Sequence, residues 1–147
     1  MNGEGKLKLR AADSDDLAVI SACLQDAVVP VKDMIYLPDD GQFIMVVNRF
    51  RWETVDGRPV EGKIYERVHS GIRFDQVGHV RRKGLDRDRT GQVLSLLTIE
   101  AADGYVDLLF SASAAIRLEV SGIMCHLDDI DEPWPTQWRP EHPLDGD

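Results

Sequence analysis

The sequence contains few cysteines, no long apolar run and a deficit of positive charge. Cysteine occurs only twice in 147 residues, as Cys23 and Cys125, and both lie among apolar neighbours. Such sparse usage argues against a disulfide-stapled secreted scaffold and predicts two buried, reduced thiols. No stretch approaches the roughly 18 apolar residues of a membrane-spanning helix. The first nine residues hold no apolar run, so we expect no signal peptide and a cytoplasmic location.

Positive charge is scarce overall but concentrated in one region. Seventeen Lys and Arg face 26 Asp and Glu, a net charge of −9, which argues against a general nucleic-acid binder. Residues 1–40 and 92–147 have net charges of −4 and −9, whereas residues 41–91 have +4, centred on Arg81–Lys83 and Asp86–Arg89. This basic island is either a solvated loop balanced by its acidic neighbours, or an electrostatic face for an acidic partner or for self-association.

Motifs that carry chemistry are also missing. The chain has no phosphate-binding loop, dinucleotide glycine motif, nucleophile elbow or paired-cysteine metal motif, and its four histidines are isolated in sequence. We therefore predict no catalytic residue, no metal site and no cofactor. The alternative is an enzyme or metal-dependent protein whose site is assembled from scattered residues such as Arg49, Arg67, His126 and Asp129. Convergence of these side chains in one concave pocket would favour that alternative.

The pattern of apolar residues predicts one helix followed by strands. Asp13 or Ser14 can cap a helix whose apolar stripe runs from Leu17 to Val28, and Pro30 ends it. Period-two patterns and Asp-Gly turns then predict strands over 31–37, 43–53, 64–74, 92–101, 105–110 and 115–120, with a polar loop over 54–63. Residues 121–130 fit either a helix or a strand entered through a bulge at Gly122, and we favour the strand.

These elements predict an α+β fold, in which the N-terminal helix packs on a mostly antiparallel, strongly bent sheet or small barrel of seven or eight strands. A pleckstrin-homology-like roll is one form of this fold, by analogy of strand count and chain length. Ile72–Asp75 and Ile116–Glu119 each follow a strand, an Asp-Gly turn and a strand. This echo is either an internal duplication or chance similarity between two amphipathic strands.

The C-terminal end differs in composition from the rest. We expect residues 1–131 to form a single domain and residues 132–147 to form a Pro- and Trp-rich tail packed on it, because four prolines in twelve residues exclude a helix or a central strand. Trp134 and Trp138 carry too much apolar surface for a free tail. They are expected to dock on the same chain, or alternatively in a groove of a second subunit.

One stretch, Asn-Arg-Phe-Arg-Trp-Glu at 48–53, combines charge and aromatic rings. On a strand, Arg49, Arg51 and Glu53 share one face and Phe50 and Trp52 the other. One interpretation is a cross-strand ladder with acidic partners such as Glu66 or Glu119. The other is a clamp for an anion or carboxylate. The candidate anion- or partner-binding residues are Arg49, Arg51, Trp52, Arg67 and Arg117.

Several blocks together carry a resemblance to a known family. They are residues 24–28 (LQDAV), 48–53 (NRFRWE), 66–68 (ERV), 115–120 (AIRLEV), 127–130 (LDDI) and 133–134 (PW). They resemble a family of small alphaproteobacterial proteins catalogued only as a domain of unknown function. In that family glycines precede the AIRLEV block, whereas this chain has Ser-Ala-Ser-Ala at 111–114. The resemblance implies a bacterial cytosolic protein and implies no activity, ligand or catalytic residue.

The function that these features favour is a non-enzymatic binding or adaptor module. Its support is the charge asymmetry and the Trp-Pro tail. The partner is expected to be another protein or a second copy of the chain, and neither nucleic acid nor a membrane. A homo-oligomeric structural protein is the remaining alternative.

Overall fold

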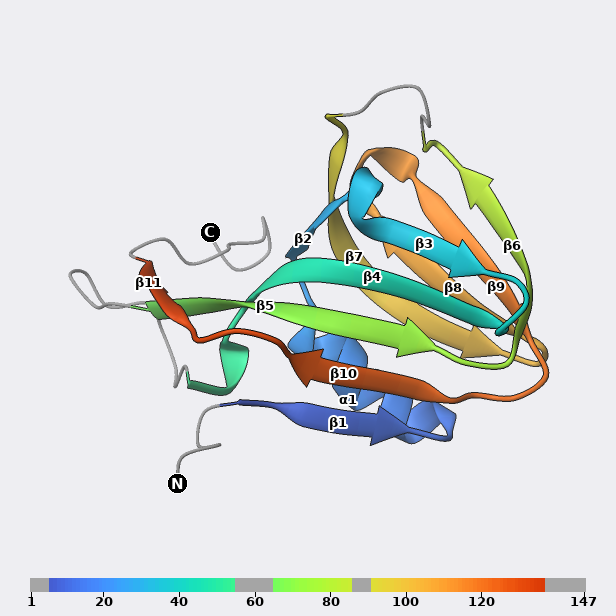
Figure 1. The fold of residues 1–147 in the computed structure, drawn as a ribbon, viewed down its shortest axis with the longest axis horizontal. Helices are drawn as coiled ribbons and strands as arrows, with labels where there is room; N and C mark the ends of the chain where they lie inside the picture. The colour runs from blue at the N-terminus through green and yellow to red at the C-terminus, as the bar shows by residue number, and fades with distance from the viewer. Residues whose placement is uncertain (1–5, 55–64, 86–90, 137–147) are drawn as a thin grey trace, which may run out of the picture.

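One α-helix and eleven strands make up the part of the chain that the computed structural model describes, residues 6–54, 65–85 and 91–136 (Figure 1). In chain order they are β1 (Lys8–Ala11), α1 (Ser14–Cys23), β2 (Ala27–Pro30), β3 (Met34–Leu37), β4 (Gln42–Phe50), β5 (Tyr65–Phe74), β6 (Val77–Lys83), β7 (Val93–Ala102), β8 (Tyr105–Phe110), β9 (Ala115–Val120), β10 (Cys125–Asp129) and β11 (Trp134–Thr136). Three 3-10 turns accompany them, η1 (Val31–Asp33), η2 (Trp52–Thr54) and η3 (Ser111–Ser113).

The sheet is antiparallel and strongly bent, which confirms the predicted class. Its order is β1-β10-β5-β4-β2-β7-β8-β9-β6, with β3 also on β4 and β11 also on β5. The count of seven or eight strands was too low, because β1, β2 and β11 have only three or four residues and show no period-two signal. The described sheet does not close into a barrel, since its path ends at β1 and β6. The pleckstrin-homology-like form is not confirmed.

The two halves of the sheet have related connections. Strands β3, β4 and β5 form one antiparallel meander, and β7, β8 and β9 form another. The strand that follows each meander pairs with the other one, so that β6 lies on β9 and β10 lies on β5. These pairings are compatible with an internal duplication, which stays a prediction.

The helix begins as predicted and ends early. The Asp13 carboxylate accepts a hydrogen bond from the Asp16 N–H at 2.8 Å, and Leu17 and Ile20 are buried. The predicted extension to Val28 is wrong, because the helix stops at Cys23 and Ala27–Pro30 pairs with β7. The two adjacent valines at 28 and 29 suit a strand, and β7 supplies the hydrogen-bond partners that local sequence cannot show.

Two other predicted regions are residues 121–130 and the turn before the AIRLEV block. Residues 125–129 form a strand between β1 and β5, which confirms the strand interpretation of 121–130. Ala112 and Ser113, before the AIRLEV block, have φ angles of 60° and 61°, in the left-handed region that favours glycine. The chain therefore makes this turn with Ala and Ser, although the left-handed region favours glycine.

The core is continuous and lies on the inner faces of the bent sheet and under α1. Its fully buried side chains include Leu17, Ile20, Phe43, Met45, Ile72, Leu108 and Ile116. Cys125 is buried there, Cys23 is half-buried, and both thiols are free. No helix in the described ranges is long and apolar enough to cross a membrane.

The described part of the tail adds a strand to the sheet. In β11, Trp134 lies opposite Arg67 of β5, and its half-buried ring centre is 4.8 Å from that of His69. Trp138, the predicted loop from residue 55 onward and the Asp86–Arg89 stretch lie outside the described residues. The docking of the whole tail stays a prediction.

Candidate functional site

Arg49 is the most deeply buried charged residue in the described part of the chain. Its side chain is 0% exposed, and it lies on β4 two residues after Val47, which is also buried. Phe43, Met45, Val47 and Arg49 alternate along β4, and all four are fully buried. The period-two pattern thus carried a signal for this burial, because Arg49 shares the strand face of three apolar side chains.

Two carboxylates enclose the Arg49 guanidinium. Its Nε and Nη2 donate to Asp129 of β10 at 3.0 and 2.9 Å, and its Nη1 and Nη2 donate to Glu53 of η2 at 2.9 and 2.8 Å. Ser70 of β5 adds a hydrogen bond to Asp129 at 2.6 Å, and the Leu7 N–H adds another at 2.8 Å. The cluster therefore joins three strands and a turn through charge-assisted hydrogen bonds.

The pKa values of the cluster follow from this geometry. Burial by itself would raise the pKa of Asp129, but hydrogen bonds from Arg49, Ser70 and the Leu7 N–H hold this pKa below its ordinary value. Glu53 behaves in the same way, because the bonds from Arg49 outweigh its burial and lower its pKa. Burial would lower the pKa of Arg49, but the two carboxylates raise it. All three groups are therefore charged near neutral pH.

Arg51 contacts one of the two partners that the ladder interpretation named, although the predicted strand over 43–53 is too long, because β4 ends at Phe50 and Glu53 lies in η2. Its guanidinium contacts Glu66 on β5 and lies 3.5 Å from Glu53, and its backbone N–H donates to the Glu66 carbonyl at 2.9 Å. Glu66 is thus a partner as the ladder interpretation predicted, whereas Glu119 pairs with Arg81 on a different part of the sheet.

Arg67 and Trp52 lie near the same end of β4. Arg67 donates to the Asn48 side chain at 2.5 Å and to the Asn48 carbonyl at 3.1 Å, and burial lowers its pKa. Trp52 donates from Nε1 to the Gln25 carbonyl at 2.9 Å and packs edge-on against Phe50 at 4.7 Å. The half-buried side chain of Asn48 therefore has a hydrogen-bond partner in Arg67.

The remaining predicted residues lie elsewhere. Arg117 is on β9, where it pairs with Asp107 at 2.8 Å and stacks over Tyr105 at 4.3 Å. His126 is on β10, and its Nε2 lies 3.6 Å from the carboxylate of Asp75 rather than beside Arg49. Of the scattered set proposed for an enzyme, the structure brings together only Arg49 and Asp129, and both are enclosed. Among the described residues no group of three or more His, Cys, Asp or Glu could hold a metal ion.

The arrangement around Arg49 is suited to holding strands together. The guanidinium already binds two carboxylates of its own chain, so an external anion would have to displace one of them. The hypothesis that Arg49, Arg51, Trp52, Arg67 and Arg117 bind an anion stays a prediction. Its test is whether sulfate raises the melting temperature of the protein and whether Arg49→Gln with Arg51→Gln removes that rise.

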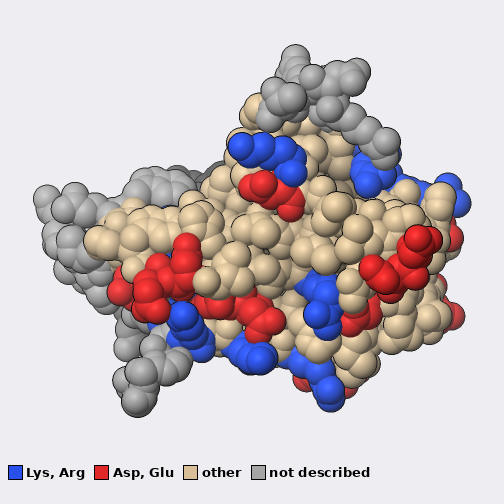
Figure 2. Space-filling view, in the orientation of Figure 1, with Lys and Arg blue, Asp and Glu red and all other residues tan. Residues whose placement is uncertain are grey.

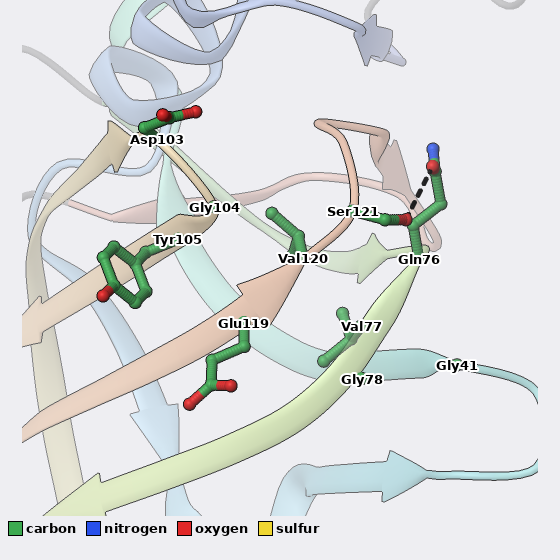
Figure 3. Close-up of a pocket in the computed structure, with 10 residues that line it drawn as sticks. All are labelled: Gly41, Gln76, Val77, Gly78, Asp103, Gly104, Tyr105, Glu119, Val120 and Ser121. Carbon is green, nitrogen blue, oxygen red and sulfur yellow. Dashed lines mark hydrogen bonds between the residues drawn. The ribbon is translucent and has the colours of Figure 1, made fainter.

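An open depression lies where several turns meet. It has a volume of about 520 Å³ and is lined by Gly41, Gln76, Val77, Gly78, Asp103, Gly104, Tyr105, Glu119, Val120 and Ser121. Ser121 donates to the Gln76 side chain at 3.2 Å. Figure 3 shows Asp103, Tyr105 and Glu119 pointing in different directions rather than toward one another. The depression therefore does not converge polar groups on a reacting atom.

Strand β6 carries Arg81–Lys83, which is the described one of the two stretches on which the basic island is centred. Its exposed side chains are His79, Arg81, Arg82 and Lys83, so the Arg-Arg-Lys triplet belongs to a strand and not to a loop. Arg117 lies directly opposite Arg81 in the β6–β9 register, and Glu119 accepts from Arg81 at 2.6 Å. Figure 2 shows basic side chains, with acidic ones beside them, at the edge of the molecule where β6 lies. The charge distribution along the chain indicated this surface, but its triplet was not among the predicted site residues.

The comparison with family models agrees with the resemblance. A model described as "Protein of unknown function (DUF2948)" matches residues 7–142. The chain belongs to the DUF2948 family. This confirms a domain of unknown function over nearly the whole chain, and the DUF2948 match includes both the Arg49 cluster and β6. No curated protein and no solved structure matches the chain.

Proposed function

We propose that this DUF2948 protein is a non-enzymatic protein-binding module and that β6 is the surface to which its partner attaches. The observation that carries the proposal is a strongly basic strand at the end of the sheet path of an acidic chain. Arg81, Arg82 and Lys83 are all exposed and consecutive, while the chain has a net charge of −9. A concentrated field of one sign favours association with an oppositely charged surface.

The rest of the described structure supports this role. Arg49 and Asp129, whose side chains are both fully buried, neutralise one another and join strands. The charged side chains of β6, in contrast, are exposed, and Arg81 pairs there with Glu119 of β9 at 2.6 Å. We place the module in the cytoplasm of a bacterium, where the free thiols of Cys23 and Cys125 would stay reduced.

Site-specific photo-crosslinking in the native host tests the proposal. The photoreactive amino acid p-benzoylphenylalanine replaces Lys83 on β6, and in a matched control it replaces Glu100, which is exposed on β7. We expect a discrete protein adduct at position 83 and none at position 100. The adduct should disappear when Arg81→Ser and Arg82→Ser are added. The same adducts at both positions, or no adduct at position 83, would overturn the proposal.

A further inference from the structure

We infer that β6 binds its partner by strand addition: an extended, acidic segment of the partner pairs its backbone with the outer edge of β6. This inference rests on the proposed function and specifies the mode of recognition and the chemistry of the partner. Strand addition combines main-chain hydrogen bonds, which supply affinity, with side-chain contacts on alternate residues, which supply specificity.

The backbone of β6 supports this mode. Within residues 6–54, 65–85 and 91–136, β6 forms a ladder with β9 alone. In an antiparallel ladder the backbone groups of a strand point alternately toward its two sides, so an edge strand presents a row of N–H and C=O groups outward. Strand β6 has seven residues, whereas β1, at the other end of the sheet path, has four.

Two hydrogen bonds reach the outer side of β6 at its beginning. The Val77 N–H donates to the Gly41 carbonyl at 2.9 Å, and the Tyr36 hydroxyl donates to the Val77 carbonyl at 3.1 Å. These two bonds attach the start of β6 to the turn after β3 and to β3 itself. Figure 1 shows β6 running on from that corner along the rim of the sheet. The edge that an added strand would use is therefore Gly78–Lys83.

Charge selects an acidic occupant for this edge. Arg81 and Lys83 lie on one face of β6 and Arg82 lies on the other, and Arg117, which pairs with Asp107, lies across from Arg81. Glu119 is the carboxylate that contacts Arg81. Opposite charges on facing strands stabilise a pair and like charges destabilise it. A second copy adding its own β6 would double the number of cations at this edge, which disfavours a homodimer through it.

The depression adjoins the other end of the same edge. Val77 and Gly78 line it, and a Cβ at Gly78 would meet only the Glu119 carbonyl, at 3.9 Å. A segment paired with 78–83 would thus end over a shallow site lined by Val77 and Val120. We expect the partner segment to carry acidic residues opposite 81–83 and an apolar residue near Gly78.

Basic edge strands also have a simpler explanation, because lysine and arginine on an edge repel other strands and prevent aggregation. The experiment must therefore separate backbone pairing from charge alone. The probe is a fluorescein-labelled eight-residue peptide in which Val alternates with Glu, with a Lys-for-Glu peptide as its charge control. Two further acidic peptides are N-methylated on either the odd or the even residues, which removes the N–H donors on one side of the strand only.

Fluorescence anisotropy with the full chain measures binding of each probe. We expect the acidic peptide to bind, the Lys peptide not to bind, and one N-methylated register to lose affinity by at least about tenfold while the other keeps it. Arg82→Ser with Lys83→Ser should weaken binding at least about tenfold, whereas Lys32→Ser, which removes an exposed charge on η1, should not.

Two outcomes would overturn strand addition. Equal binding of both N-methylated peptides and the unmodified peptide would show that charge alone attracts them. Absence of binding by every acidic peptide would show that the edge is only protected. If position 83 still captures a partner in the host, the proposed function stands and only strand addition fails. If position 83 captures nothing, the proposed function fails whatever the peptides do.

Discussion

Arg49 and Asp129 form a two-point ion pair between side chains that are both 0% exposed, although the two residues lie 80 positions apart in the chain. The pair joins β4 to β10 across β5, where Ser70 bonds to the same carboxylate. Removing one member of a buried pair leaves an uncompensated charge, which is strongly destabilising. We therefore expect a conservative substitution at either residue to cause a large loss of stability.

Asp129→Asn should lower the free energy of unfolding by about 3 kcal/mol, because the buried guanidinium loses one of its two carboxylates. The neighbouring Asp128→Asn is the matched control, since Asp128 lies on the other face of β10 and is half-buried. It should change stability by less than about 0.5 kcal/mol. Urea denaturation of the two variants and the wild type measures both values. Equal effects would contradict the role assigned to the cluster.

Stability should fall in acid through the same carboxylates. The pKa values of Asp129 and Glu53 are lower in the folded protein than in the unfolded chain, where carboxyl groups have pKa values of about 4. The unfolded chain therefore binds more protons in this range, and the contribution present above about pH 5 is lost as the pH falls through the folded values. Urea midpoints from pH 7 to pH 3 should decline less steeply for Asp129→Asn than for the wild type. Parallel declines would contradict this origin.

Alanine substitutions at three glycines distinguish the cost of a positive φ angle from the cost of a steric clash. Gly84 has a φ of 76° and an added Cβ would lie 3.0 Å from the Ala114 Cα, Gly104 has a φ of 85° in open space, and Gly91 has neither constraint. Substitution by Ala should thus destabilise most at 84, by about 1 kcal/mol at 104 and hardly at 91. Thermal melts of the three variants give the order. A Gly84→Ala protein as stable as Gly91→Ala would contradict the turn.

The turn before β9 predicts the opposite effect. Ala112 and Ser113 both have φ angles near 60°, which cost L-residues about 1 kcal/mol each relative to glycine. Ala112→Gly and Ser113→Gly should each raise the melting temperature, or leave it unchanged where the added freedom of the unfolded chain offsets the relief. Exposed Ala18 on α1 is the control, because Ala18→Gly should destabilise by about 1 kcal/mol. Losses at 112 and 113 as large as at 18 would contradict the left-handed turn.

The tail provides a test that includes a residue outside the described ranges. Trp134→Ser removes a half-buried ring that packs against His69, and it should cost about 1–2 kcal/mol of unfolding free energy. We expect a comparable loss for Trp138→Ser, because the sequence predicts that both rings dock on the domain. Urea denaturation of both variants measures this, and a stability unchanged in both would mean that the tail does not pack on the domain.

Local sequence was sufficient for elements whose signals are local. The Asp13 cap, the turn glycines at 41 and 104 and the strict alternation over 115–120 each depend on neighbours in the chain, and the structure has each of them as predicted. The helix end was mispredicted because β2 exists through its pairing with β7. A four-residue strand has no stability without such a partner.

For the candidate site, the alternation of apolar residues was enough to predict which face of a strand a side chain occupies. Alternation along β4 placed Arg49 with Phe43, Met45 and Val47, and the charge count identified a basic stretch around 81–83. The contact of Arg49 with Asp129 and the place of β6 at the end of the sheet path could not be predicted in this way. Both depend on pairing between strands that are distant in the chain. Strand pairing is non-local, and a one-dimensional pattern specifies faces without specifying neighbours.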